Sequence, residues 1–77
     1  MWQEINNKLT KTFTFRDFDE AWAFMEQVAA LARELDHHPT WTNKYNTVKF
    51  ELSTHAEGKV TAKDRQLAEA IDNLSAK

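Results

Sequence analysis

The longest helical pattern in this chain ends at its only proline, Pro39. Apolar residues recur every three or four positions from Phe18 to Leu35, and this spacing predicts a helix with one apolar face. Asp17 is placed to cap the start of that helix. The helix must end by His38, because a proline disfavours helical geometry in the residue before it. The rest of the chain is thereby divided into two segments that must fold around this helix.

The apolar stripe of the helix predicts which of its side chains enter the core. Its members are Phe18, Trp22, Met25, Ala29, Ala32 and Leu35, widened by Ala21, Val28 and Leu31. We expect Phe18, Trp22 and Met25 to be core residues, because an amphipathic helix buries its apolar face. The opposite face is charged and is expected to be solvated.

Alternating apolar and polar residues on both sides of the helix predict four strands. The four segments are 2–5, 8–15, 40–45 and 47–53. Asn6-Asn7 and Asn46 separate them into two hairpins, because asparagine tolerates the positive φ of tight turns. Lys11 is the one charged residue on the apolar face of its strand. Period-two alternation is typical of strands with one face buried.

A second helix follows, in which Thr61 is expected to be the N-cap and Asp64 occupies the capping-box position. Its predicted core face contains Leu67, Ile71 and Leu74. The order is therefore ββαββα. We predict an α+β fold with two layers, in which two helices pack on one face of a four-stranded antiparallel sheet. We expect residues 1–77 to form a single domain.

Composition excludes several classes of protein. The chain has 77 residues, no cysteine and a net charge of −2, so disulfides and thiolate metal sites are excluded. The mixed charges argue against binding to nucleic acid. No apolar run is long enough for a membrane span or a signal peptide, and we expect a cytoplasmic location. A chain this short has a thin core, which favours homo-oligomerisation.

The titratable residues predict a site at one rim of the sheet. His37 and His38 lie at the exit of the first helix, His55 lies at the end of the last strand, and Asp64 lies at the start of the second helix. If the ends of these elements meet, the four side chains converge. Imidazole titrates near neutral pH, so this group is suited to general acid–base catalysis. Asp64 could fix the tautomer of a histidine or raise its pKa.

Each of these residues also has a structural explanation. Histidines after a helix C-terminus are favoured by the helix dipole, His55 alone could be a surface residue, and Asp64 is explained by capping. Trp41 fits the core, an interface or the wall of a pocket for a flat ligand. Three histidines and a carboxylate also allow a zinc site. Against zinc, His37 and His38 are adjacent instead of sharing a helix face.

The combined pattern resembles the pterin-4a-carbinolamine dehydratases. It consists of His37-His38-Pro39, the aromatic Tyr45, then His55 after nine intervening positions, and Asp64. The segments 35–41 and 52–55, the Tyr45-Asn46 turn and Phe15-Arg-Asp-Phe18 also look like that family. The resemblance covers nearly the whole chain. It implies a fold of two β-hairpins alternating with helices, as the periodicity predicts.

The resemblance also implies a function. A member of this family is a hydro-lyase that dehydrates 4a-hydroxytetrahydropterin to quinonoid dihydropterin in tetrahydrobiopterin recycling, with no cofactor and no metal. His37 and His55 would be the acid–base pair, His38 would bind and orient the pterin, and Asp64 would tune or orient a histidine. The expected substrate-binding residues are His37, His38, Pro39, Trp41, Thr54, His55, Ala56 and Glu57.

Two alternatives belong to other functional classes. By resemblance the chain is expected to form homo-dimers or homo-tetramers, and it could be a non-catalytic binding or dimerisation module of the transcriptional-cofactor type. A small zinc-binding domain is the third hypothesis. The complete histidine and aspartate set favours the enzyme, because a scaffold has no need of it.

Overall fold

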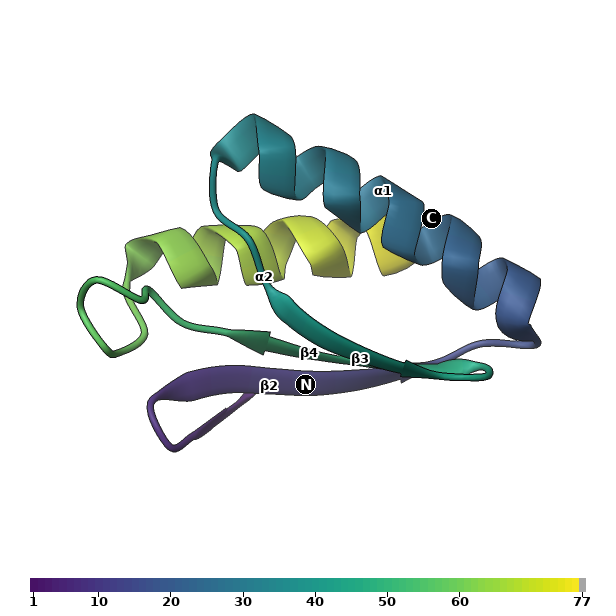
Figure 1. The fold of residues 1–77 in the computed structure, drawn as a ribbon, viewed down its shortest axis with the longest axis horizontal. Helices are drawn as coiled ribbons and strands as arrows, with labels where there is room; N and C mark the ends of the chain where they lie inside the picture. Colours follow the sequence, from purple (N-terminus) through teal and green to yellow (C-terminus); the bar gives the residue numbers. More distant parts are fainter. Residues whose placement is uncertain (77) are drawn as a thin grey trace.

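The computed structural model describes residues 1–76 and has two β-hairpins that alternate with two helices (Figure 1). The elements in chain order are β1 Gln3–Ile5, β2 Lys8–Thr14, α1 Phe18–Leu35, β3 Thr40–Lys44, β4 Thr47–Leu52 and α2 Ala62–Ser75. Both helices lie over the same face of the sheet (Figure 1). The predicted two-layer ββαββα fold is therefore confirmed.

The four strands form one antiparallel sheet in the order β1-β2-β4-β3. The two central strands come from different hairpins, and their register places Leu9 opposite Leu52 and Phe13 opposite Val48. These apolar residues share the face that the helices cover, as the period-two pattern predicts. The pairing of β2 with β4 thus joins the two halves of the chain into one sheet.

The first hairpin turn was predicted correctly, and the second turn differs in one residue. Asn6 and Asn7 both have positive φ, as a two-residue turn requires. In the second turn Tyr45 has the positive φ, at 50°. Asn46 instead donates a hydrogen bond from Nδ2 to the carbonyl of Phe15, at 2.8 Å. Asn46 therefore ties the second hairpin to the segment between β2 and α1.

Helix α1 begins and ends with local caps. The Asp17 side chain accepts a hydrogen bond from the Glu20 N–H at 2.9 Å, as predicted. At the other end Asp36 takes the left-handed conformation, with φ of 51°. The next N–H, that of His37, donates to the Ala32 carbonyl at 3.0 Å. This C-terminal cap fixes the direction in which the chain leaves the helix and so positions His37.

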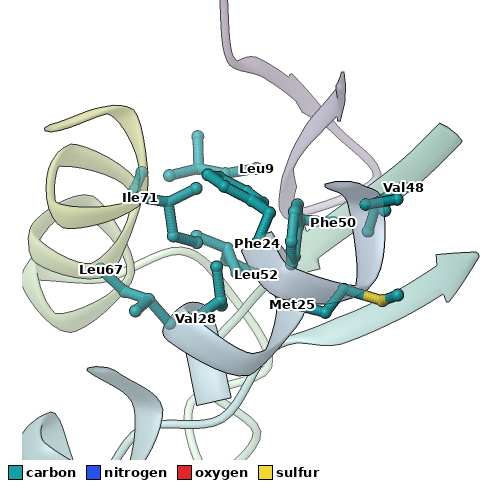
Figure 2. Packing of buried hydrophobic residues seen from close by; sticks show 11 residues of the cluster. Leu9, Phe24, Met25, Val28, Val48, Phe50, Leu52, Leu67 and Ile71 are labelled. Carbon is teal, nitrogen blue, oxygen red and sulfur yellow. The ribbon is translucent and has the colours of Figure 1, made fainter. Parts of the chain in front are cut away.

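The core lies between the sheet and the two helices (Figure 2). Its largest members are Leu9, Phe24, Met25, Val28, Val48, Phe50, Leu52, Leu67 and Ile71. The prediction for the start of the α1 stripe was wrong, because Phe18 and Trp22 are 42% and 52% exposed. Phe24 is buried instead. Helix α1 packs against α2 as well as the sheet, so its buried face is rotated towards the second helix.

Among residues 1–76, no helix combines the length and the hydropathy needed to cross a membrane.

Candidate active site

The centre of the candidate site is the carboxylate of Asp64, in the first turn of α2. Its side chain is fully buried. Oδ2 accepts a hydrogen bond from the Thr61 N–H at 2.8 Å, which is the predicted capping contact. The positive end of the helix dipole also favours a negative charge at this position. Capping alone, however, leaves the other carboxylate oxygen to be explained.

That other oxygen contacts a histidine from a distant part of the chain. Oδ1 of Asp64 lies 2.5 Å from Nε2 of His37, which follows α1. The His37 side chain is 12% exposed, so part of the ring reaches solvent while the rest is enclosed. Residues 27 positions apart in the sequence are thus joined by one short contact.

Thr54 supplies a third group to the same carboxylate. This residue follows β4, and its hydroxyl donates to Oδ2 of Asp64 at 2.8 Å. The Thr54 and Thr61 hydroxyl oxygens lie 2.5 Å apart. Within residues 1–76, no buried side-chain nitrogen or oxygen lacks a hydrogen-bond partner. The exit of α1, the end of β4 and the start of α2 therefore meet at one buried polar network, which we call the Asp64 network (His37, Thr54, Thr61 and Asp64).

These hydrogen bonds set the charge of Asp64. Burial alone would raise the pKa of the carboxyl group, but hydrogen bonds from His37, the Thr61 N–H and the Thr54 hydroxyl outweigh it and lower the pKa below its ordinary value. An ionised carboxylate can only accept hydrogen bonds, so Nε2 of His37 must carry a hydrogen. Nδ1 is then the ring nitrogen that is left to exchange a proton with another molecule.

The other predicted site residues adjoin members of this network in the sequence, and most of them are exposed. His38 is exposed next to His37, and Pro39 is half-buried. His55, Ala56 and Glu57 form an exposed loop directly after Thr54. The loop is closed by backbone hydrogen bonds between Thr54 and Lys59 and from Gly58 to the carbonyls of Thr54 and His55. His55 is thus attached to a residue of the network, and its own ring faces solvent.

Trp41 lies in β3 and packs edge-on against Phe50, with ring centroids 5.7 Å apart. It also lines a hollow of about 240 Å³ between β3 and α1, together with Trp22, Met25, Glu26, Ala29 and Arg33. None of the Asp64 network residues lines this hollow. The structure therefore associates Trp41 with the exposed side of α1.

A metal site would need several ligands close together. In the part of the chain that the structure describes, residues 1–76, no three histidine, aspartate or glutamate side chains form a group that could hold a metal ion.

The sequence pattern did not identify the hydroxyl contacts of the network. Thr54 was expected only as a substrate-binding residue, and Thr61 was expected only as a helix cap. Both side chains belong to the Asp64 network. A threonine is common at strand ends and helix starts, so neither residue stands out until the fold brings them together.

Comparison with known proteins identifies the family of this chain. The model of the family described as pterin 4 alpha carbinolamine dehydratase matches residues 1–74. The chain belongs to the pterin-4a-carbinolamine dehydratase family. The resemblance in the sequence is thereby confirmed, and it covers all the residues of the Asp64 network.

Relatives within the dehydratase family are similar over most of their length. A protein of Bradyrhizobium sp. strain BTAi1 that is named as a pterin-4-alpha-carbinolamine dehydratase is 49% identical over 97% of this chain and 78% of its own length. One from Prochlorococcus marinus strain NATL2A is also 49% identical, over 95% of this chain and 77% of its own.

Solved structures of the dehydratase family show the same fold. A transcriptional coactivator/pterin dehydratase from Brucella melitensis has a TM-score of 0.90 and 42% identity over 94% of this chain and 79% of its own. A pterin dehydratase-like protein described as a RuBisCO assembly factor in the alpha-carboxysome has a TM-score of 0.78 and 25% identity over 96% and 86%. Similar folds thus carry names that indicate a dehydratase, a transcriptional coactivator and an assembly factor.

Proposed function

We propose that this protein dehydrates 4a-hydroxytetrahydropterin to quinonoid dihydropterin and water, as a step in tetrahydrobiopterin recycling. The observation that carries the proposal is the contact between His37 and the buried, ionised Asp64. A module that only binds another protein has no need to hold a histidine against a buried carboxylate. Membership of the dehydratase family supports the same reaction.

The reaction needs one acid and one base. The hydroxyl group on carbon 4a leaves as water when an acid gives it a proton, and a base removes a proton from a pterin nitrogen as the new double bond forms. We assign these roles to His37 and His55, because an imidazole gives and takes protons near neutral pH. After one turnover the acid has lost a proton and the base has gained one, and exchange with water restores both.

The remaining site residues would bind the pterin or support the acid–base pair. Asp64 holds the hydrogen of Nε2 and leaves Nδ1 of His37 for the substrate. His38 would bind and orient the pterin beside it. The half-buried Pro39, the exposed Ala56 and Glu57 and the backbone of Thr54 would line the pocket. Trp41 lies on the hollow beside α1 and would bind the substrate only at the edge of this pocket.

A stopped-flow absorbance assay of carbinolamine dehydration in EDTA tests the proposal. We expect wild-type protein to accelerate dehydration over buffer, and we expect His37→Ala to lose that acceleration by about 10²- to 10⁴-fold, the usual contribution of a general acid or base. Lys49→Ala, an exposed charge on the sheet, is the matched control and is expected to keep the wild-type rate. Loss of the wild-type rate in EDTA would contradict metal-free catalysis.

A folded wild-type protein without activity would instead favour a binding module. The exposed aromatic side chains Phe18, Trp22 and Trp41 would then be its contact surface, because aromatic residues are enriched in interfaces.

We further propose that the enzyme is a homo-dimer or homo-tetramer that uses this aromatic surface. Glu26 and Arg33 line the same hollow and are seven positions apart on α1. Two antiparallel copies of the helix would pair each Glu26 with the Arg33 of the other copy. Trp22→Glu is expected to shift the mass measured by light scattering towards the monomer, and an unchanged mass would contradict this surface. The cytoplasmic location stays a prediction.

A further inference from the structure

We propose that the hydroxyl groups of Thr54 and Thr61 form a hydrogen-bonded chain that positions Asp64 and thereby selects the tautomer and orientation of His37. Thr54 and Thr61 are positioning residues in this proposal, because neither has to touch the substrate. The inference rests on the proposed function for its kinetic part. Its structural part concerns the histidine ring alone and can be tested without substrate.

Each threonine has one hydroxyl hydrogen, and this determines which hydroxyl donates and which accepts in the hydrogen-bonded chain. Thr54 has one hydroxyl hydrogen, and its contact with the ionised Asp64 requires that Thr54 donate it, at 2.8 Å. The 2.5 Å contact between the two hydroxyl oxygens must then be donated by Thr61. The Thr61 hydroxyl oxygen lies farther from Oδ2 of Asp64, at 3.5 Å. Because Thr61 has already donated its one hydroxyl hydrogen to Thr54, it has none left for this contact. The order is therefore Thr61 to Thr54 to Asp64.

The two carboxylate oxygens of Asp64 have different partners. Oδ2 accepts from the Thr54 hydroxyl and from the Thr61 N–H, both at 2.8 Å. Oδ1 contacts Nε2 of His37. Two donors on one oxygen prevent the carboxylate from rotating, so the other oxygen is held towards the ring. In metal sites, a hydrogen bond from a histidine ring N–H to a carboxylate fixes the tautomer and orientation of that ring.

Simple helix capping explains less of the geometry. Capping explains the Thr61 N–H bond to Asp64 and the return contact, in which the Thr61 side chain accepts from the Asp64 N–H. It does not require a hydroxyl from Thr54, which belongs to another element, or a short contact between the two hydroxyls. The Thr54 hydroxyl donates to a carboxylate whose second oxygen contacts a histidine, and the Thr61 hydroxyl donates to Thr54. The geometry therefore fits a device for holding His37 better than a device for starting α2.

The decisive variants are Thr54→Val, which keeps the shape and removes the hydroxyl, and Thr54→Ser, which keeps the hydroxyl. Thr12→Val, an exposed threonine in β2, is the matched control for a threonine-to-valine change in the sheet. Long-range ¹H–¹⁵N spectra of the His37 ring, recorded at a pH where the ring is neutral, report which nitrogen carries the hydrogen. Stopped-flow dehydration gives kcat and KM for the same samples.

We expect the wild-type and Thr12→Val proteins to show the tautomer with the hydrogen on Nε2. Thr54→Val is expected to show a mixture of both tautomers and a kcat lowered about tenfold with KM changed less than twofold, comparable to the loss of outer hydrogen bonds elsewhere. Thr54→Ser should restore both readouts. A folded Thr54→Val protein with the wild-type tautomer and kcat would overturn the proposal, as would a wild-type ring with its hydrogen on Nδ1.

A second variant covers the case in which Thr54→Val does not fold. Thr61→Val removes the first hydroxyl donor and keeps the Thr61 N–H. We expect a tautomer mixture and a lowered kcat, both smaller than in Thr54→Val. Thr61→Ser should restore both the tautomer and kcat. Wild-type spectra and kcat in Thr61→Val would then overturn the proposal. If the wild-type protein is inactive but the tautomer changes as expected in these variants, the positioning proposal holds and the proposed function fails.

Discussion

The two histidines assigned to the acid–base pair are held in opposite ways. His37 is 12% exposed, and its ring contacts a buried carboxylate that two hydroxyls and one N–H surround. His55 is exposed in a loop that is closed by backbone hydrogen bonds. The position of one ring is therefore set by side-chain contacts, and the position of the other is set by the shape of a loop. Substitutions should affect the two regions differently.

The largest effect on stability is expected at the centre of the buried region. Asp64→Ala leaves Nε2 of His37, the Thr54 hydroxyl and the Thr61 N–H without an acceptor, and breaking a buried charged contact costs about 3–5 kcal/mol. We expect a loss of this size in the free energy of unfolding by urea. Asp64→Asn keeps one carbonyl oxygen and is expected to lose less.

Asp72 provides a matched control on the same helix. Its side chain is 41% exposed and accepts from Lys11 and Trp2. Exposed ion pairs contribute little, so Asp72→Ala is expected to cost about 1 kcal/mol. Equal losses in Asp64→Ala and Asp72→Ala would contradict the distinction between the buried network and the surface.

The histidines themselves test the comparison directly. His37→Ala removes a donor from the buried carboxylate and is expected to cost about 1–3 kcal/mol of stability. His55→Ala removes an exposed ring and is expected to cost less than about 0.5 kcal/mol. Both should slow dehydration strongly, because both are assigned to the acid–base pair. If urea unfolding showed that His55→Ala is as destabilising as His37→Ala, the loop would have to be more ordered than its exposure indicates.

Acid should weaken the buried region. Because the pKa of Asp64 is below its ordinary value of 3.8 in the folded chain, the unfolded chain binds a proton more readily. The contribution of Asp64 to stability is therefore complete above about pH 4 and is lost as the pH falls through the lowered pKa. Asp17 acts in the same direction, because the Glu20 N–H lowers its pKa.

Urea unfolding between pH 5 and pH 2 measures this contribution. Wild-type stability should fall more steeply with decreasing pH than that of Asp64→Asn, which has no carboxyl group at this position. Asp17→Asn is the control for the exposed cap and is expected to keep most of the wild-type slope. Parallel curves for wild type and Asp64→Asn would show that folding does not lower the pKa of the Asp64 carboxyl group.

A small effect is also expected at Gly58, in the loop that carries His55. Gly58 has φ of +65°, and a Cβ atom added there would meet nothing within 4 Å. The cost of Gly58→Ala is therefore conformational and is expected to be about 1 kcal/mol by thermal or urea unfolding. Gly58→Asn should cost less, because asparagine tolerates this conformation. An alanine variant as stable as wild type would indicate that the loop can adopt another shape.

The local pattern of the sequence determined most of the fold. The apolar spacing of α1, the caps at Asp17 and Thr61, and the alternation in the strands act over a few residues, and they predicted the elements and their order. Helix α1 ends at Leu35 and so before His38, as the effect of Pro39 on the preceding residue predicts. These effects depend on neighbours in the chain, so a single sequence is enough to see them.

The tertiary structure decided which surfaces and contacts these elements present. Spacing alone placed Phe18 and Trp22 in the core, but packing against α2 rotated α1 and left them exposed. The sequence also grouped His37 with Asp64, whereas the hydroxyls of Thr54 and Thr61 became part of the network only when the end of β4 met the start of α2. Such contacts join residues that are distant in the chain, so they cannot be predicted from patterns that extend over only a few residues.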